Sequence, residues 1–531
     1  MRKYYYLLIV FSPLLTLAQQ KNLPLNQQSF QRTESMLSRK GDITYHSAVK
    51  PIIESNVGTY NLQGACGVFT YYDSLKRSWL ARKVKHESLV VLKDSSTGMF
   101  ITIDPVFNLE YDKDNNIDTG KYYQNTRGIL VRGDIGTKFS FESSFYENQA
   151  FFVNYVDSFV RANEVVPGQG RVKAFKTNGF DYAMASGYIS YSPFKKLNLQ
   201  MGHGKHFIGD GYRSLLLSDN AFNYPYVRAT TSIGKFQFTN ILASLQLIDN
   251  GRIFITALNE PLFQKKTATF HYVSYMPVSK VQFGLFQSTM YNVRRGYSPT
   301  FNANYVNPFI LSSAMQFGLS SNDNVMLGAT AKFNITRFVS VYGQYVVDDV
   351  DSKKMSTHNK NGYQIGLKYH DAFTLKNLYL QAEYNSVSAF TYSFRKPEQN
   401  YTHYNQSLAH PLGANFNEVV GILRYSLLDF FIEAKINYAT YGADSAYKHY
   451  GNNVLLPDDN AGVLTDNKIQ GFSTTLSTYA FSFGYKVNRA TNMNIVAGVY
   501  MRTLNNTFQH SVTDYFFIGF RTSLSNTYFD F

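Results

Sequence analysis

Apolar and polar side chains alternate strictly in several parts of the chain. In the segments 324–335, 362–370, 377–385 and 430–438, every second residue is apolar and the residues between them are mostly polar or charged. Successive side chains of a β-strand point to opposite faces, so each segment has one apolar and one polar face. A shift of one residue would carry Lys332 to the apolar face, which makes the register of its strand well specified. The alternation predicts β-strands.

The connections between these segments fall into two classes. Residues 426–429 are a short connection, whereas residues 442–467 form a long polar one. Short turns at one end and long loops at the other are typical of an outer-membrane barrel, whose strands alternate lipid-facing and lumen-facing residues over about 10 positions. We therefore predict an all-β fold: a transmembrane antiparallel β-barrel of roughly 16–18 strands in residues 94–531. The chain has Tyr 42 and Phe 43 but Trp 1, and aromatic residues suit the lipid face and its two interfacial girdles.

Two regions depart from the strand rhythm. Residues 19–93 alternate poorly and include 28–39, which has helical composition, so we predict a small, partly helical periplasmic or plug segment there. In residues 151–161 the apolar side chains are spaced for one face of a short helix, although a continued strand that ends at Pro167-Gly168 fits the pattern equally well. The apolar positions of this second region are Phe152, Val153, Val156, Phe159 and Val160.

Both ends of the sequence carry features of an exported protein. Residues 1–18 have the charged, apolar and small-residue regions of a secretory signal peptide, with cleavage predicted after Ala18. The apolar run is shorter than the roughly 20 residues of a membrane-spanning helix. The last residues predict a terminal strand that ends in Phe531, which resembles the recognition signal of the outer-membrane insertion machinery. Together these features predict that the protein is located in the outer membrane of a Gram-negative bacterium.

Charge and residue chemistry limit the functions that the chain can have. The net charge of +14 suits contact with outer-membrane lipid, anionic lipopolysaccharide or an acidic glycan, and export argues against nucleic acid. The single Cys66 excludes an intramolecular disulfide. His203 and His206 are flanked by glycines that favour a strand and a loop over a metal-binding helix. No nucleophile elbow, Walker motif or dinucleotide fingerprint occurs. We therefore expect no enzyme activity, no cofactor and no metal.

Three stretches of the sequence resemble one known family. Residues 202–221 form a glycine-rich turn followed by a leucine–serine and acidic or amide run, GHGKHFIGDGYRSLLLSDNA. Residues 306–349 contain VNPF, SNDNV and YGQYVVDD, and residues 400–415, NYTHYNQSLAHPLGAN, are the most specific stretch. They are similar to the Wzi-like capsule-assembly outer-membrane proteins, most closely to their Bacteroidota branch, which includes the gliding motility protein RemB. Where these relatives tend to have Arg-Pro-x-Glu, this chain has Ser313-Ala314-Met315-Gln316.

The resemblance implies a large barrel that binds or helps assemble surface polysaccharide. In the gliding branch it also implies support of movement over surfaces, with motility or secretion machinery as further partners. Sugars bind by stacking on aromatic rings and by hydrogen bonds to amide, carboxylate and guanidinium groups. The residues that we predict for polysaccharide binding are Tyr401, His403, Tyr404, Asn405, His410, Arg213, Asp219 and Asn220.

Two alternatives stay open at this stage. The same residues would also serve to order a loop or to plug the lumen, because buried polar groups in a barrel must be hydrogen-bonded. The polar inward faces of the strands also fit a diffusion channel or transporter of the porin type.

Overall fold

The computed structural model describes most of the barrel and its interior. The described residues are 20–40, 45–57, 78–115, 122–248, 264–291, 307–310, 323–349, 360–445, 447–458, 469–522 and 525–531. The predicted signal peptide and the Ser313–Gln316 departure lie outside these residues.

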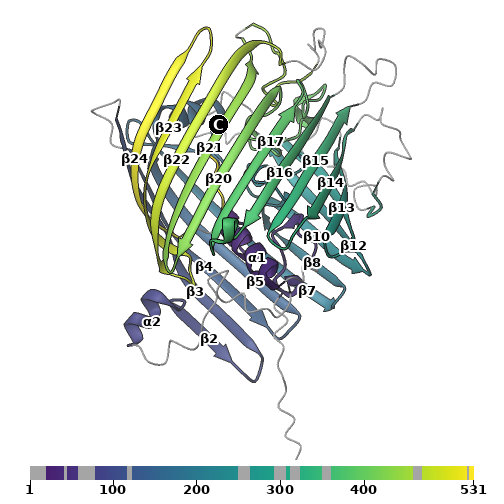
Figure 1. Cartoon of the computed structure of the whole chain (residues 1–531), viewed down its shortest axis with the longest axis vertical. Coiled ribbons are helices and arrows are strands. Elements are labelled where there is room, and N and C mark those ends of the chain that lie inside the picture. Colours follow the sequence, from purple (N-terminus) through teal and green to yellow (C-terminus); the bar gives the residue numbers. More distant parts are fainter. Residues whose placement is uncertain are drawn as a thin grey trace, which may run out of the picture.

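Within this part of the chain, eighteen antiparallel strands close into a barrel, in which each strand pairs with the next and the last pairs with the first (Figure 1). They are β3 (Met99–Asp114), β4 (Tyr122–Ile135), β5 (Phe139–Phe151), β7 (Gly179–Phe194), β8 (Leu197–Gly204), β10 (Tyr224–Ile233), β11 (Phe236–Leu247), β12 (Gln264–Val278), β13 (Val281–Met290), β14 (Asn324–Asn334), β15 (Val339–Asp349), β16 (Lys360–His370), β17 (Leu378–Val387), β20 (Phe416–Leu427), β21 (Phe430–Ala443), β22 (Phe472–Asn488), β23 (Met493–Asn505) and β24 (His510–Thr522). The predicted all-β barrel is confirmed, and the strand number is the upper end of the predicted range.

Short strands add to this ring or lie inside it. β2 (Val90–Asp94) extends the sheet beside β3, and β6 (Lys173–Phe175) pairs with β7. The two-residue strands β1 (Val49–Lys50) and β9 (Phe207–Ile208) pair with each other, as do β18 (Thr402–His403) and β19 (Gln406–Ser407).

The alternation seen in the sequence sets which face of the wall each side chain occupies. The four alternating segments fall on β14, β16, β17 and β21. On β14 the Lys332 side chain points into the barrel and is buried, whereas Phe333 points outward and is 42% exposed. Outward residues of other strands, such as Ile365 and Leu285, are apolar and more than half exposed, as a lipid-facing surface requires.

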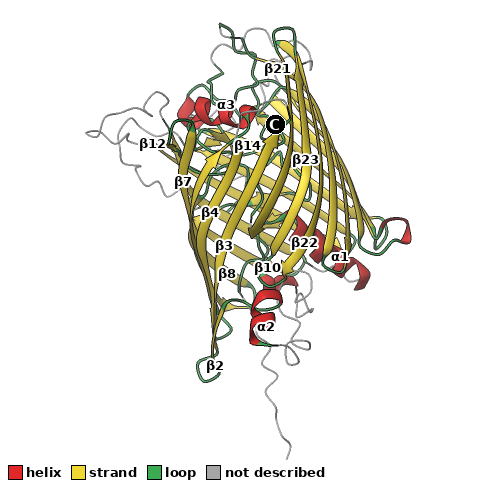
Figure 2. Cartoon of the chain, turned by 90° about the vertical axis from the view of Figure 1, so that its left-hand side faces the viewer, coloured by secondary structure: helices red, strands yellow, loops and turns green. Residues whose placement is uncertain are grey.

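The two ends of the barrel differ in their connections. One end carries short turns, for example Leu428-Asp429, and the other carries the long segments that follow β5, β8, β17 and β21. By the usual arrangement of outer-membrane barrels, the long-loop end is extracellular. Helix α3 (Asn154–Asn163) lies at this end, and α2 (Trp79–Lys85) lies at the other (Figure 2). In the region 151–161 the helical alternative therefore holds from Asn154 onward, whereas Phe151 still belongs to β5. Among the described residues, no helix is long and apolar enough to cross a membrane.

Helix α1 (Gln27–Lys40) confirms the predicted helical composition and lies inside the barrel wall (Figure 1). Glu34 on this helix forms ion pairs with Lys332 at 3.1 Å and Lys368 at 2.8 Å, two inward-pointing residues of the wall. Lys332 also pairs with Asp210 at 3.1 Å, in the segment that follows β8. Lys332 and Lys368 of the wall are therefore neutralised by segments that fold into the lumen.

The prediction that the last strand ends in Phe531 is wrong. Strand β24 ends at Thr522, and residues 525–531, which we call the tail, turn back into the barrel. Asp530 in the tail is only 1% exposed and forms ion pairs with Arg213 and Lys435. Arg213 and Lys435 lie in the lumen, and the Asp530 carboxylate can be buried only next to such cations. The tail therefore turns into the barrel.

We expect Lys332→Ala to destabilise the barrel strongly. The substitution leaves Glu34 and Asp210 buried with less compensating charge, and breaking a buried ion pair in this way typically costs about 3–5 kcal/mol. The urea midpoint of the protein reconstituted in lipid vesicles should fall accordingly. Lys280→Ala, at an exposed turn, is the matched control and should leave the midpoint unchanged. Equal midpoints for the two variants would contradict this role of Lys332.

Candidate functional site

A cavity of about 320 Å³ opens among the segments at the long-loop end of the barrel. Amide side chains dominate its lining, the aromatic rings of Phe159 and Phe531 lie beside them, and Asp444 is the single acidic side chain among the described lining residues. We call this space the mouth cavity. Its amides are Asn163, Asn220, Asn405, Gln406, Asn452 and Asn453.

The segment between β17 and β20 supplies a tight hairpin to the mouth cavity. Thr402 pairs with Ser407 and His403 pairs with Gln406, so Tyr404 and Asn405 form a two-residue turn. Both turn residues have positive φ, 52° and 51°. Such a turn favours asparagine, whose short polar side chain tolerates the left-handed conformation.

The hairpin is fixed against the segment around α3. The Asn405 side-chain amide donates to the Asn163 carbonyl at 3.2 Å. The Gln406 side chain bonds twice to the turn that follows α3, by accepting from the Gly168 amide at 2.6 Å and donating to the Gln169 carbonyl at 2.9 Å. These hydrogen bonds thus connect the hairpin to the end of α3 and the turn that follows it, which are distant in sequence.

Asn220 and Asp219 belong to the segment that follows β8. Asn220 lines the mouth cavity and donates to the Ser407 carbonyl at 3.1 Å. Its neighbour Asp219 points toward the tail instead, where its carboxylate accepts from Asn526 and from the Tyr528 hydroxyl, both at 2.8 Å.

The aromatic residues of the hairpin segment lie beside and below the cavity. Tyr401 is buried, and Tyr404 is half-buried with its ring centroid 4.8 Å from that of Phe222. Burial lowers the pKa of His403 to about 3, so this imidazole is neutral at physiological pH. Its Nδ1 accepts from the Gln246 amide at 2.9 Å, which leaves Nε2 to donate to the Asn223 carbonyl at 3.1 Å.

Arg213 and His410 meet deeper in the lumen. His410 Nε2 is 2.6 Å from Glu418, and the Arg213 guanidinium is 3.1 Å from the same carboxylate. Arg213 also pairs with Asp530 of the tail at 3.2 Å, and Lys435 pairs with that carboxylate at 2.9 Å. We call these five residues the central ion cluster.

The predicted binding residues therefore fall into three places. Asn405 and Asn220 line the mouth cavity, and Tyr404 lies next to it. Tyr401, just before the hairpin, and His403, within it, are buried, whereas Arg213, Asp219 and His410 hold interior segments together. Sequence reasoning missed Asn163, Asn452, Asn453 and Asp444, because they lie on separate loops without a shared motif.

The two histidines His203, near the end of β8, and His206, just after it, are separated in the structure. His203 Nδ1 lies 2.9 Å from the Ala185 carbonyl, whereas His206 is buried with its ring 4.4 Å from that of Tyr226. In the described part of the chain, no group of three His, Cys, Asp or Glu side chains is placed to hold a metal ion.

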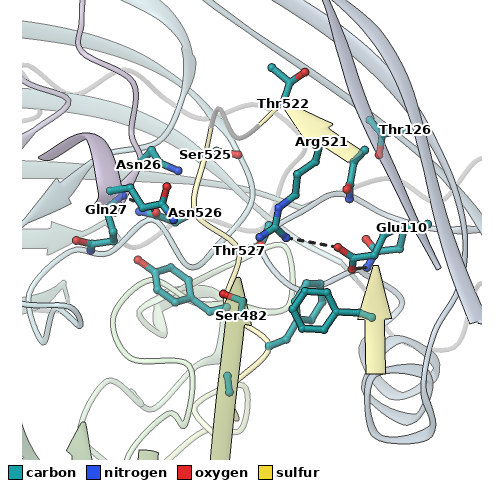
Figure 3. A pocket seen from close by; sticks show the side chains of 18 of the residues that line it. Asn26, Gln27, Glu110, Thr126, Ser482, Arg521, Thr522, Ser525, Asn526 and Thr527 are labelled. Carbon is teal, nitrogen blue, oxygen red and sulfur yellow. Dashed lines mark hydrogen bonds and ion pairs between the residues drawn. The ribbon is translucent and has the colours of Figure 1, made fainter. Parts of the chain in front are cut away.

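A second cavity, of about 310 Å³, lies within the barrel beside the tail (Figure 3). Its walls come from inward residues of β3, β22 and β24, from the start of α1 and from residues 525–530. We call it the luminal cavity. No local motif predicted it, because its residues are spread over most of the chain.

Comparisons with known proteins agree with this architecture. A family model described as capsule assembly protein Wzi matches residues 110–514. The solved structure of Escherichia coli Wzi, described as an outer-membrane carbohydrate-binding β-barrel involved in group 1 capsule assembly, is 13% identical, covers 95% of this chain and 100% of its own, and has a TM-score of 0.56. Acinetobacter baumannii OccAB2 is 11% identical over 79% of this chain and 97% of its own, with a TM-score of 0.44. Among curated proteins, no significant match was found.

We expect Asp530→Ala to release the tail from the lumen. The substitution leaves Arg213 and Lys435 with one buried carboxylate fewer, and an uncompensated buried charge typically costs about 3–5 kcal/mol. In a Cys66→Ser background, a Tyr528→Cys reporter should then react with a maleimide at least about tenfold faster. Asp157→Ala, which removes an exposed ion pair of α3, is the control. Unchanged labelling in the Asp530 variant would mean that this carboxylate does not hold the tail.

Proposed function

Because this chain belongs to the Wzi family of capsule assembly proteins, and is thus an outer-membrane β-barrel of a Gram-negative bacterium, we propose that it binds surface polysaccharide at the mouth cavity without enzymatic chemistry. The observation that carries the proposal is the set of six amide side chains gathered around about 320 Å³ at the long-loop end. Amides both donate and accept hydrogen bonds, which matches the hydroxyl groups of sugars. Phe159 and Phe531 add apolar faces for stacking.

In this proposal some of the predicted residues contact the glycan and the others support them. Asn405 and Asn220 contact the glycan, and Tyr404 offers a half-buried ring beside them. Five buried residues hold the hairpin and its neighbouring segments in position. They are Tyr401, His403, Asp219, Arg213 and His410. The excess of basic residues in the chain favours anionic partners such as lipopolysaccharide around the barrel.

We extend the proposal to gliding motility, on the resemblance of residues 202–221, 306–349 and 400–415 to the Bacteroidota branch that includes RemB. Polysaccharide held at the cell surface supplies the adhesive layer on which cells move. Motility or secretion machinery is then the expected protein partner.

We predict that removal of two mouth amides weakens glycan retention. The double variant Asn405→Gly/Asn453→Ala removes two hydrogen-bonding groups, and glycine preserves the left-handed turn at position 405. Two lost hydrogen bonds correspond to about tenfold weaker binding. Labelled surface polysaccharide should shift from cells to medium, and cells filmed on glass and agar should glide less.

Asn334→Ala, at a short turn on the opposite end of the barrel, is the matched control. Normal polysaccharide retention in the double variant would mean that the mouth cavity is not the binding site. Normal retention with impaired gliding in a deletion strain would instead indicate a motility accessory.

The porin-like alternative makes a different prediction. Five segments, 20–40, 45–57, 205–223, 388–415 and 525–531, pack inside the barrel in the described structure, where buried ion pairs and hydrogen bonds hold them. We therefore expect the purified protein to be electrically silent in a planar lipid bilayer. Steady conductance would instead favour a diffusion channel.

A further inference from the structure

The luminal cavity has the size of a ligand site. Its volume of about 310 Å³ is close to that of the mouth cavity, and small-molecule pockets typically measure roughly 300–1,000 Å³. The side chains that surround it point inward from the wall and from the tail, and Figure 3 shows Arg521, Glu110, Ser482 and Asn526 among them.

The charged groups of the luminal cavity balance one another. Three cations and three carboxylates are found among its described lining residues, and each cation has a carboxylate partner. The pairs are Arg521 with Glu110 at 3.4 Å, Lys435 with Asp530 at 2.9 Å, and Arg424 with Glu433. A charged ligand would therefore enter a space that offers it no unpaired counter-charge, which is costly.

The uncharged groups of the lining suit a sugar. The rings of Tyr212, Tyr500 and Tyr515 supply flat faces, and the amides of Gln124 and Asn148 supply hydrogen-bonding groups. At the edge of the same cavity, Asn108 Oδ1 and Arg521 Nε are buried without a hydrogen-bond partner in the described structure. One is an acceptor and the other a donor, and a hydroxyl group can serve both kinds of partner.

We propose that the luminal cavity is a second saccharide site that takes one or two uncharged sugar residues. This inference rests on the proposed glycan-binding function and adds a separate location and a substrate class. The tail forms part of the wall of both cavities, because residues 525–530 line the luminal cavity and Phe531 lines the mouth cavity. The two sites are therefore adjacent but distinct.

The test is calorimetric titration of the full-length protein in detergent micelles. The probes are neutral hexose and N-acetylhexosamine disaccharides, each compared with the counterpart that carries a uronic acid. Ser482→Trp fills the luminal cavity from β22, and Phe481→Trp, an outward position of the same strand, is the matched control that leaves the cavity open. Ala480→Leu, a smaller filling change in the same strand, serves if the tryptophan variant does not fold.

We expect at least one neutral disaccharide to bind to two sites on the unmodified protein and to one site on Ser482→Trp, with two sites retained by Phe481→Trp. The uronic counterpart should bind the luminal site at least about tenfold more weakly. Equal stoichiometry in the unmodified and the filled protein would overturn the luminal site and leave the mouth proposal standing. If no neutral disaccharide binds, the luminal cavity holds water only and is not a saccharide site. That result would overturn the inference even if the polysaccharide-retention experiment supports the mouth cavity.

Discussion

The ion pairs of the buried Arg213 guanidinium hold the interior of the barrel together. Arg213 is among the largest fully buried side chains, and a cation removed from water in this way is tolerated only with well-placed counter-charges. Glu418 of the wall and Asp530 of the tail provide them. The backbone amide of Arg213 also donates to Glu383 of β17 at 3.0 Å. One residue thus joins an inward loop, the wall and the tail.

This cluster explains why two cavities exist rather than one open lumen. The tail crosses the interior because Asp530 must reach Arg213 and Lys435. On one side of it remains the luminal cavity, with balanced charges, and on the other the mouth cavity, lined by amides. The electrostatic requirement of a few buried groups therefore sets the geometry of both candidate binding sites.

The barrel wall could be predicted from the sequence because lipid and lumen impose a period of two on every strand, as the segment around Lys332 shows. The interior could not be predicted to the same extent. Phe529 and Phe531 look like the end of a lipid-facing strand, yet the carboxylate of Asp530 between them finds its cations only inside the barrel. For the mouth cavity, the stretch 400–415 led to Asn405, whereas Asn452 and Asn453 come from the loop after β21 and are brought there by the antiparallel pairing of β20 with β21.

Hydrogen–deuterium exchange measures whether polysaccharide binds at the mouth cavity. The purified barrel would be compared with and without polysaccharide released from the surface of the same cells. We expect slower exchange confined mainly to the hairpin at 402–407 and the loop at 447–458, both of which contribute lining residues. Unchanged exchange at both segments, under conditions in which the polysaccharide is bound, would contradict binding at the mouth cavity.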